Sequence, residues 1–391
     1  MKTHKLIFAV LLLFGASFTL QAQNLMPKPI PTAAPFLAST PDARGSALGY
    51  SGVATSPDAF SMFYNPAKYA FMENEHTMIA SGFNLFSPLA YTIPFMVFDA
   101  FAQKIGNSAI AASVRYYKSG DYEIYDAVHQ LVGYYRPQEF AVDLAYSYRF
   151  SEYLSAGVAA RFIHARMDTE TPEFNVKSSA VAGDVSVFYK RPLGSLVDMS
   201  LGAAITNIGT KMANYSAYNH KDFLPTTLRL GSGFKFNFHP KNTLAVNVEF
   251  TKLMVPEAPI RDVEGNILYG YDNNVSVIRG LFQSFYDAPG YALNNDTDGF
   301  ERVGTFYEEL CEINTGIGLE YNLADHFFAR TGFYHTPYLK GRVNCLTEGL
   351  GMRFGIFGMD LSYSYYFSRT WVVLNSQHMR SFLRWDMYFA F

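Results

Sequence analysis

Few residues in this chain have the types and spacing that enzymatic chemistry requires. The sequence contains no G-x-S-x-G, H-E-x-x-H or C-x-x-C pattern. His164 and His335 fall near the outer ends of predicted strands, where a site acting on lipid could lie. A single histidine in such a place is more often an interfacial polar residue. We therefore expect no catalytic residue, no metal site and no cofactor.

Cys311 and Cys345 are the only cysteines of the 391-residue chain. Both fall at predicted outer ends of strands, and an exported protein meets oxidising conditions. We predict a disulfide between them that ties two outer loops together. The strand expected between them adds distance and is the main objection, so two free thiols remain the alternative.

The elements that would position these residues follow an export signal. Lys2 and Lys5 give a positively charged start, the apolar run Leu6–Phe14 follows, and Ala22 offers a small residue for cleavage. Residues 1–22 are therefore predicted to be a signal peptide. The net charge of −3 argues against nucleic acid as a partner. No later stretch is long and apolar enough for a membrane helix, so the exported chain is either soluble or a membrane β-barrel.

The composition and the alternation of side chains favour the barrel. Charged residues make up 17% of the chain and aromatic residues another 17%, whereas soluble proteins usually have about 25% charged residues. Apolar and polar or small residues alternate along residues 139–150, 313–323 and 359–368, as they do in membrane strands. The last predicted strand ends on Phe391, and such an aromatic final strand resembles the C-terminal signature of outer-membrane proteins.

We predict fourteen strands, near residues 76–84, 88–98, 108–118, 139–150, 154–167, 180–190, 198–207, 226–237, 243–252, 312–323, 326–336, 346–354, 358–368 and 381–391. Short and long connections alternate between them, as periplasmic turns and outer loops do in a barrel. A soluble all-β protein would also alternate, but it would not explain aromatic residues on the outer face at strand ends. The predicted fold is an all-β membrane protein, a 14-stranded antiparallel outer-membrane β-barrel over residues 76–391.

The faces predicted to line the lumen carry charges of both signs. They comprise Arg115, Asp143, Arg149, Arg161, Asp184, Arg229, Lys235, Glu249, Glu320, Arg353, Asp360, Arg384 and Asp386. A selective pore more often shows one dominant sign. We therefore favour ion pairs that hold the walls together over a conducting pore.

The predicted outer loop 253–311 is too long for a simple connection. Apolar residues at roughly helical spacing follow Val277, and aromatic residues recur near its end. We interpret the loop as a partly helical cap that either binds a partner or only covers the barrel. The residues best placed to contact secreted cargo or another partner are Leu281, Phe282, Phe285, Tyr286, Phe306 and Tyr307.

Residues 23–75 precede the first predicted strand and are rich in small residues and turn signals. Their central part, residues 41–67, reads P-D-A-R-G-S-A-L-G-Y-S-G-V-A-T-S-P-D-A-F-S-M-F-Y-N-P-A. Small residues allow close packing, and Asn65-Pro66 favours a turn. This compact segment could fold into the lumen as a hatch.

The motif resembles the N-terminal hatch of the FadL family of fourteen-stranded transporters for hydrophobic compounds. It is closer to the PorV (LptO) branch of that family, from the type IX secretion system. The motif covers residues 35–67, and strand count, length and Phe391 agree over the rest. The residues that the resemblance assigns to the hatch are Asp42, Gly49, Gly52, Asp58, Asn65, Pro66 and Ala67.

What the resemblance implies is a protein of the cell outer membrane that transports proteins. Members of this branch collect cargo carrying a C-terminal signal domain as it leaves the translocon channel. They pass the cargo to a sortase-containing attachment complex, in contact with outer-membrane lipid. Two alternatives remain: a FadL-type channel for hydrophobic compounds, which needs an apolar pocket and a gap in the wall, and a lipid A deacylase using His164 or His335.

Overall fold

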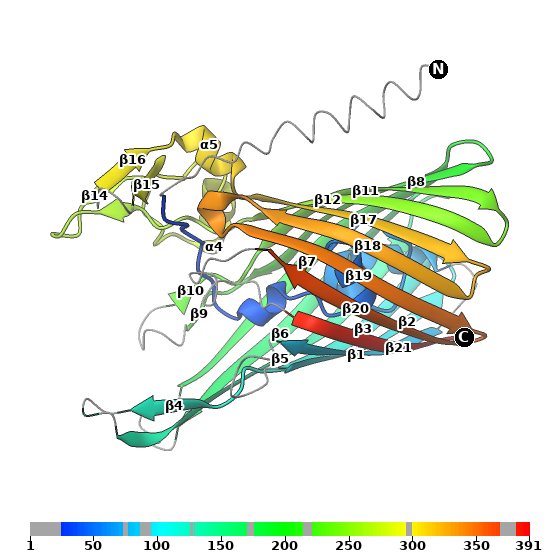
Figure 1. The fold of residues 1–391 in the computed structure, drawn as a ribbon, viewed down its shortest axis with the longest axis horizontal. Coiled ribbons are helices and arrows are strands. Elements are labelled where there is room, and N and C mark those ends of the chain that lie inside the picture. The colour runs from blue at the N-terminus through cyan, green and yellow to red at the C-terminus, as the bar shows by residue number, and fades with distance from the viewer. Residues whose placement is uncertain are drawn as a thin grey trace.

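Long antiparallel strands close into one barrel (Figure 1). The structure, a computed structural model, describes residues 25–72, 77–86, 95–125, 128, 130–169, 176–213, 221–294, 299–367 and 381–391. The signal peptide predicted at residues 1–22 lies outside these residues. The fourteen barrel strands within the described residues are β1 (Thr77–Phe86), β2 (Phe95–Ile105), β3 (Ser108–Lys118), β5 (Leu131–Arg149), β6 (Leu154–Thr169), β7 (Val176–Pro192), β8 (Val197–Gly209), β11 (Thr227–His239), β12 (Asn242–Leu253), β17 (Ile313–Leu323), β18 (Phe327–Thr336), β19 (Val343–Phe354), β20 (Phe357–Tyr366) and β21 (Ser381–Ala390).

The ring closes where the first and last strands pair. β1 pairs with β21, from Met78 opposite Ala390 to Leu85 opposite Leu383. The register then runs without a shift from β1 through β2 and β3 to β5. A short strand, β4 (Tyr122–Tyr125), pairs with the outer part of β5 and extends the wall beyond the ring. The predicted 14-stranded antiparallel barrel is confirmed.

The connections at the two ends of the barrel differ in length. One end carries the short turns 106–107, 150–153, 193–196, 240–241, 324–326 and 355–356, and Phe391 lies there beside Thr77. We take this end as periplasmic. The other end carries the long connections, seen at the left of Figure 1. No helix in the described part of the chain combines the length and the hydropathy needed to cross a membrane.

Side chains alternate strictly between the lumen and the outer surface, because successive residues of a strand point to opposite faces. In β5, Val142, Leu144 and Tyr146 are exposed outward, whereas Asp143 and Ala145 are buried inward. Aromatic pairs flank the barrel near both ends of the strands, for example Phe357 with Phe389 at the periplasmic end and Phe83 with Trp385 nearer the outer end. These rings form the girdle that a lipid-facing barrel requires.

One predicted strand was misplaced. The strand expected near residues 88–98 is β2, which covers Phe95–Ile105. Its alternation is hidden because the inner residues Phe98, Ala100 and Ala102 are apolar and pack on the segment inside the barrel. Residues 87–94, which formed most of the predicted strand, lie outside the described residues. The remaining strands overlap their predicted ranges, with β5, β6 and β7 longer than expected.

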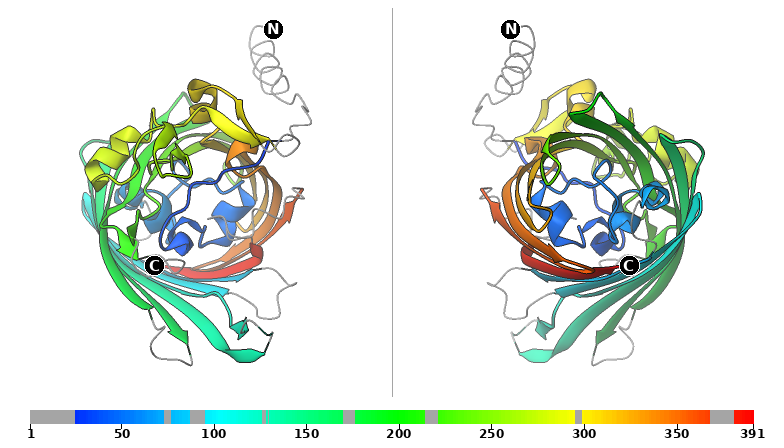
Figure 2. Two further views of the ribbon diagram at one scale, coloured as in Figure 1. Left: turned by 90° about the vertical axis from the view of Figure 1, so that its left-hand side faces the viewer. Right: turned by 90° about the vertical axis from the view of Figure 1, so that its right-hand side faces the viewer.

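The N-terminal residues 25–72, here called the lumenal segment, occupy the interior of the ring (Figure 2). They form η1 (Pro35–Ala38), α2 (Ala43–Ala47), α3 (Ser61–Tyr64) and η2 (Pro66–Phe71). Their larger side chains, including Tyr64 and Lys68, are almost fully buried. Apolar clusters join the segment to the inner wall, one of them around Phe60, Met62 and Phe98. The interior of the barrel is therefore a packed core.

The loop between β12 and β17 folds into a separate cap over the outer end. Its elements are β13 (Ile260–Arg261), β14 (Ile267–Tyr269), α4 (Val277–Gln283), β15 (Tyr291–Asn294), β16 (Gly299–Arg302) and α5 (Thr305–Leu310). The two short strand pairs and two short helices lie at the left of Figure 1. The lumenal segment reaches this cap, since Leu25 bridges to Asn294.

Candidate functional site

The lumenal segment is bound to the wall through carboxylates that accept its backbone N–H groups. Glu249 of β12 accepts bonds from Gly52 N and Val53 N at 2.7 and 2.9 Å. Asp386 of β21 accepts a bond from Ala43 N at 2.5 Å. Both acids are buried, and Glu249 also pairs with Arg229, so the hydrogen bonds that Glu249 accepts are charge-assisted and stronger than neutral ones. They fix the depth of the segment in the barrel.

Two residues of the N-terminal motif shape the backbone of the segment. Asp42 caps α2 by accepting from Gly45 N at 2.6 Å, and its second oxygen accepts from the Tyr64 hydroxyl at 2.8 Å. Asn65 caps η2, and its side-chain amide donates to the carbonyl oxygens of Val53 and Val187 at 2.9 and 3.0 Å. Pro66 follows as the first helical residue, where its missing N–H costs nothing.

Glycines allow the segment to approach the wall at backbone distance. Gly49 adopts φ +65°, which favours glycine. A Cβ placed on Gly332 of β18 would lie 2.2 Å from Gly49 N. The alternating pattern of β18 identifies Gly332 as inward-facing but does not show what it faces. The structure shows that Gly332, which has no side chain, leaves room for the backbone of Gly49.

A buried network links the segment to three strands. The Arg44 guanidinium donates to both carboxylate oxygens of Glu320 at 2.9 Å. Glu320 also accepts from Arg330 at 2.7 Å, and Arg330 donates to Asp360 at 2.6 Å. Arg44 further pairs with Asp58 at 3.0 Å. Asp58 therefore stabilises the position of Arg44, as Asp42 stabilises the start of α2; both contacts lie within the lumenal segment.

Several other charges that face the lumen are also paired. Arg161 bridges Asp143 and Asp184, and Arg229 pairs with Glu249 at 2.9 Å. Arg115, in contrast, sits among the rings of Phe36, Phe63 and Phe98 at 5.2 to 6.0 Å and lies 3.9 Å from Asp143. The ion pairs combine opposite charges, as we expected for the mixed signs, whereas Arg115 and Arg384 each keep a buried guanidinium nitrogen without a hydrogen-bond partner.

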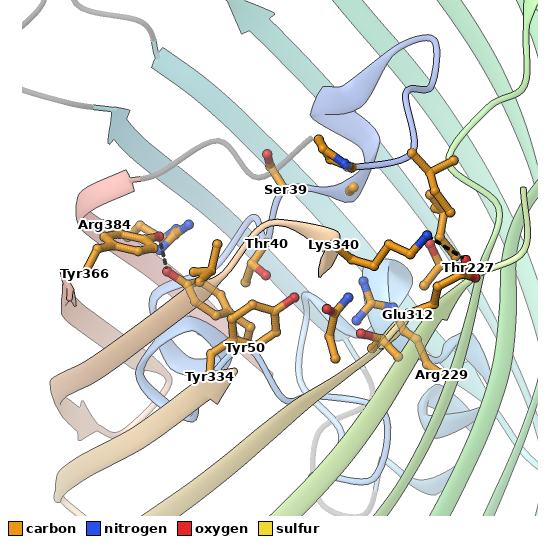
Figure 3. A pocket seen from close by; sticks show the side chains of 17 residues that line it. Ser39, Thr40, Tyr50, Thr227, Arg229, Glu312, Tyr334, Lys340, Tyr366 and Arg384 are labelled. Carbon is orange, nitrogen blue, oxygen red and sulfur yellow. Dashed lines mark hydrogen bonds and ion pairs between the residues drawn. The ribbon is translucent and has the colours of Figure 1, made fainter. Parts of the chain in front are cut away.

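Two chambers lie on opposite sides of the lumenal segment. The outer one, of about 120 Å³, is lined by Ser39, Tyr50, Arg229, Lys340 and Arg384 among others (Figure 3). In it, the Tyr50 hydroxyl bonds that of Tyr366 at 2.6 Å, and the Arg384 guanidinium lies over the Tyr50 ring. The periplasmic one, of about 640 Å³, has charges of both signs, including Lys190, Asp198 and Arg353. Apolar side chains also line both chambers, for example Ile30 and Val343 in the outer one and Phe71 and Phe188 in the periplasmic one, so each chamber mixes apolar and charged groups.

A buried cluster of charges holds the outer cap on the barrel. Lys340, just before β19, contacts Glu257, Glu308 at 3.1 Å and Glu312 at 3.3 Å. Lys252 of β12 pairs with Glu312 and with Glu309 at 3.2 Å. Lys28 of the lumenal segment lies 3.2 Å from Glu257. The cluster thus joins the cap, two strands and the lumenal segment.

Burial and pairing set the pKa values in this cluster. Burial would lower the pKa of Lys340, but Glu257, Glu312 and Glu308 hold it above its ordinary value. Burial would raise the pKa of Glu257, but Lys340 and Lys28 bring it below the ordinary value. Burial raises the pKa of Glu312 to about 7. Burial, aided by the nearby Glu309, raises the pKa of Asp287 to about 7. The cap therefore carries groups that titrate near neutral pH.

The cap presents aromatic and apolar side chains to solvent. Phe282 is 68% exposed and Phe306 is 77% exposed, values unusual for phenylalanine. The other exposed members are Ile278, Phe285, Tyr286, Tyr307 and Leu310, whereas Leu281 is half-buried. We call the exposed set, with Phe282 and Phe306, the cap surface. It includes five of the six loop residues that the sequence singled out.

The predicted disulfide is absent, because Cys311 and Cys345 are both free thiols. Cys311 packs with Leu25 and Leu339 beneath the cap. Cys345 lies on the inner face of β19, in a separate cluster with Tyr334 and Val343. The intervening strand sends the two side chains to different places, as the objection to this pairing anticipated. Burial raises the pKa of the Cys311 thiol, which makes it less reactive.

The two candidate histidines lie apart on the wall. His164 Nδ1 is 2.9 Å from Ser179 Oγ, and His335 Nδ1 is 2.7 Å from Asn344 Oδ1. Each thus bonds to a neutral side chain on the neighbouring strand. Within the described residues, no group of three or more His, Cys, Asp or Glu side chains is placed to hold a metal ion.

Sequence reasoning missed the residues that join the parts. Lys28, Lys340, Glu257, Glu308 and Glu312 lie in loops or at strand ends, where no periodicity marks them. The alternation of β18 places Arg330 on the inner face, but the set of predicted lumenal charges does not include it. Arg44 stands within the motif, and only its partner on a distant strand gives it a role.

A closed barrel with a packed interior and an ordered outer cap defines an outer-membrane protein of the FadL-like fold. Two crystal structures of the Pseudomonas putida toluene transporter TodX are similar, each with a TM-score of 0.51. The first is 11% identical and covers 89% of this chain and 96% of its own. The second is 12% identical and covers 90% of this chain and 98% of its own. The Ralstonia pickettii toluene transporter TbuX has a TM-score of 0.49 at 12% identity, with 89% of this chain and 97% of that chain covered. The search of curated proteins finds no match.

The family model described as type IX secretion system protein PorV matches residues 21–260. The match includes the lumenal segment and the strands from β1 to β12. The chain belongs to this family, and it is an outer-membrane component of the type IX secretion system.

Proposed function

We propose that this protein is a carrier of secreted proteins. It receives cargo by its C-terminal signal domain as the cargo leaves the translocon channel, and it delivers the cargo to the sortase-containing attachment complex. The observation behind this proposal is the cap surface: several exposed aromatic side chains on a cap anchored by buried charges. Aromatic anchors on a rigid support are typical of protein-binding surfaces.

The interior supports a carrier over a FadL-type channel. Uptake of a hydrophobic compound needs an apolar pocket and a gap in the wall. The outer chamber has Arg229, Lys340 and Arg384 in its lining, among apolar residues. The register from β1 to β5 has no shift, although β7 and β8 pair with an irregularity between Gly183 and Val185. The FadL-like fold is compatible with both functions, so binding of a fatty acid or hydrocarbon by the purified protein would favour the channel.

We further propose that the protein has no catalytic role. His164 bonds to the neutral side chain of Ser179, which cannot activate it as a base in the way a carboxylate does. Replacing His164 and His335 with Ala should leave lipid A unchanged in the outer membrane. A change in its acyl chains would support the deacylase alternative.

Cargo binding can be tested on the cap surface. Deleting the gene should leave cargo in the periplasm, and the wild-type gene should restore surface display. The double variant Phe282→Ser, Phe306→Ser should bind a purified cargo C-terminal domain about thirtyfold or more weakly, since loss of two anchors costs at least about 2 kcal/mol. Val263→Ser is the matched control, because Val263 is 98% exposed in the same loop but lies apart from both helices. Equal binding by all three proteins would refute the cap surface as the cargo site.

A further inference from the structure

Two acidic side chains face outward in the middle of barrel strands. In β2, Asp99 is exposed between Phe98 and Ala100, which are buried toward the lumen. In β19, Glu348 is exposed beside Thr347, which is fully buried. No other acidic residue of the described strands occupies such a position. Outward-facing residues elsewhere at mid-strand are apolar, small or uncharged.

Both residues lie at the depth of the lipid hydrocarbon. Each is six residues before the periplasmic end of its strand, at Ile105 and Phe354. With about 3.3 Å per residue and a strand tilt of about 40°, this places them roughly 15 Å above the turns. The apolar band of a barrel is about 25 Å tall, so they fall near its middle. A carboxylate that faces lipid there is unfavourable, and such residues mark functional sites.

A groove surrounds Asp99 on the outer wall. It has a volume of about 440 Å³ and is bordered by Ile79, Val114 and Met387. Ser81, the register partner of Asp99, is small and leaves space for the groove between the larger side chains. Among the described residues, the Asp99 carboxylate has no recorded hydrogen bond or ion pair. The groove therefore exposes an unpaired acid in an apolar setting.

Asp99 and Glu348 belong to one wall, formed by β19, β20, β21, β1 and β2. Four strand spacings separate them, about 19 Å. Between them the wall is apolar and aromatic, with Leu361 exposed and Phe83 packed on Trp385 at 4.5 Å. Such an apolar surface suits contact with the apolar face of another membrane protein.

We propose that this wall docks, within the membrane, on a different membrane protein that presents Lys or Arg side chains to Asp99 and Glu348. A second copy of this chain does not fit, because the wall has no outward cation at this depth and a symmetric contact would oppose like charges. Lipid does not fit either, since acyl chains offer no donor and head groups lie at the interface. The wall is distinct from the cap surface, so the proposal stands apart from cargo binding.

The test places a photo-crosslinking amino acid at Ser81, inside the groove, in cells that express the full chain. The matched control position is Ser232, which faces outward on β11 across the barrel. We expect one discrete protein adduct from position 81, with its cross-linked peptide in a membrane-spanning segment that contains Lys or Arg, and none from position 232. The Asp99→Leu, Glu348→Leu double variant should reduce this adduct by about tenfold or more, as loss of charge pairing does.

Stability separates docking from folding in the same variant. Leucine suits a lipid-facing site better than a carboxylate, so the purified double variant should resist unfolding at least as well as the wild type. An adduct that is unchanged by the double substitution, that contains only lipid, or that joins two copies of this chain would overturn the proposal. If the double variant loses the adduct because its barrel unfolds, the single variants Asp99→Leu and Glu348→Leu decide. An unchanged adduct in both folded single variants would also overturn the proposal.

Discussion

At the scale of residues, charge in this barrel serves attachment. Arg44 comes from the lumenal segment, and its partner Glu320 stands 276 positions away on β17. Arg330 and Asp360 extend the pairing across neighbouring strands. Buried ion pairs of this kind add little net stability compared with apolar packing, but removal of one partner leaves an uncompensated charge.

Substitution of Arg44 by Ala should therefore destabilise the folded protein. Glu320 would keep Arg330 as a partner, so we expect a loss of about 2 kcal/mol, below the range for a fully orphaned charge. Urea unfolding in detergent micelles, followed by tryptophan fluorescence, measures the change.

The control for Arg44 is Arg261→Ala in the outer cap. Arg261 pairs with Asp272 at 3.2 Å, but both side chains are about half exposed. Exposed pairs contribute about 0–1 kcal/mol, so this variant should remain close to wild type. Equal stabilities of the Arg44 and Arg261 variants would show that the buried network does not hold the segment.

At the scale of elements, the lumenal segment and the cap depend on close contact with the wall. Gly332 lets β18 touch the backbone of Gly49, and the cluster around Lys340 joins the cap to β12 and β19. Neither contact is local in sequence. Each can be broken while the strands themselves stay paired.

Replacing Gly332 with Ala should loosen the lumenal segment. The added methyl group would lie 2.2 Å from Gly49 N and 2.5 Å from the Leu48 carbonyl carbon, so one backbone must move. We expect trypsin to cleave after Arg44 or Lys68 in the variant under conditions in which wild type is resistant. Heat-modifiable migration on a gel reports whether the barrel itself stays folded.

Thr331→Ala is the control on the same strand. Thr331 is exposed and faces away from the lumen, so this variant should keep its resistance to trypsin. Protection of Arg44 and Lys68 in the Gly332 variant would show that the segment tolerates the added methyl group.

The cap should close more firmly as the pH falls through 7. Asp287 has a pKa of about 7 in the closed cap because it is buried beside Glu309, against about 3.9 when exposed. The closed cap therefore binds a proton that the open cap does not, between roughly pH 7 and pH 4. Glu312, with a pKa of about 7, acts in the same direction. The lowered pKa of Glu257 opposes this only as the pH falls below its ordinary value.

Hydrogen exchange of residues 253–311, corrected for intrinsic rates, measures this closure. Wild type should show greater protection at pH 6 than at pH 8. Asp287→Asn should reduce the difference without removing it, because Glu312 still titrates. A larger pH effect in Asp287→Asn than in wild type would contradict the assignment.

At the scale of the whole molecule, the barrel is a closed body with one filled interior. The lumenal segment separates the outer and periplasmic chambers, and both views of Figure 2 show it inside the ring. Ion pairs between the lumenal segment and the wall, such as Arg44 with Glu320, hold the segment between the two chambers. A barrel of this kind provides a membrane anchor for its cap and its wall.

Purified protein in a planar bilayer should give no stable open-channel current. Removal of residues 25–72 should open the lumen and produce conductance, since the remaining interior is polar. Circular dichroism and heat-modifiable migration would verify that the shortened chain still forms a barrel. Steady conductance by the intact protein would show that the segment does not seal the lumen.

The class of fold could be predicted from the sequence. Fourteen strands, their inward and outward faces and the long outer loops could be predicted because alternation and turn residues are local properties of the chain. β2 was misplaced because Ala100 and Ala102 make its lumenal face apolar, and that face is apolar only because it meets the lumenal segment. The motif at residues 35–67 likewise indicated the family without showing its contacts.

The contacts that join the parts could not be predicted, because they depend on how distant segments pack. Arg44 meets Glu320, Lys340 meets Glu257, and Cys311 stays apart from Cys345 because the closed ring fixes which distant side chains share one space. Asp99 and Glu348 have ordinary positions in the sequence. Closure of the barrel places both on a single wall, since the pairing of β1 with β21 brings β2 and β19 within four strands of each other.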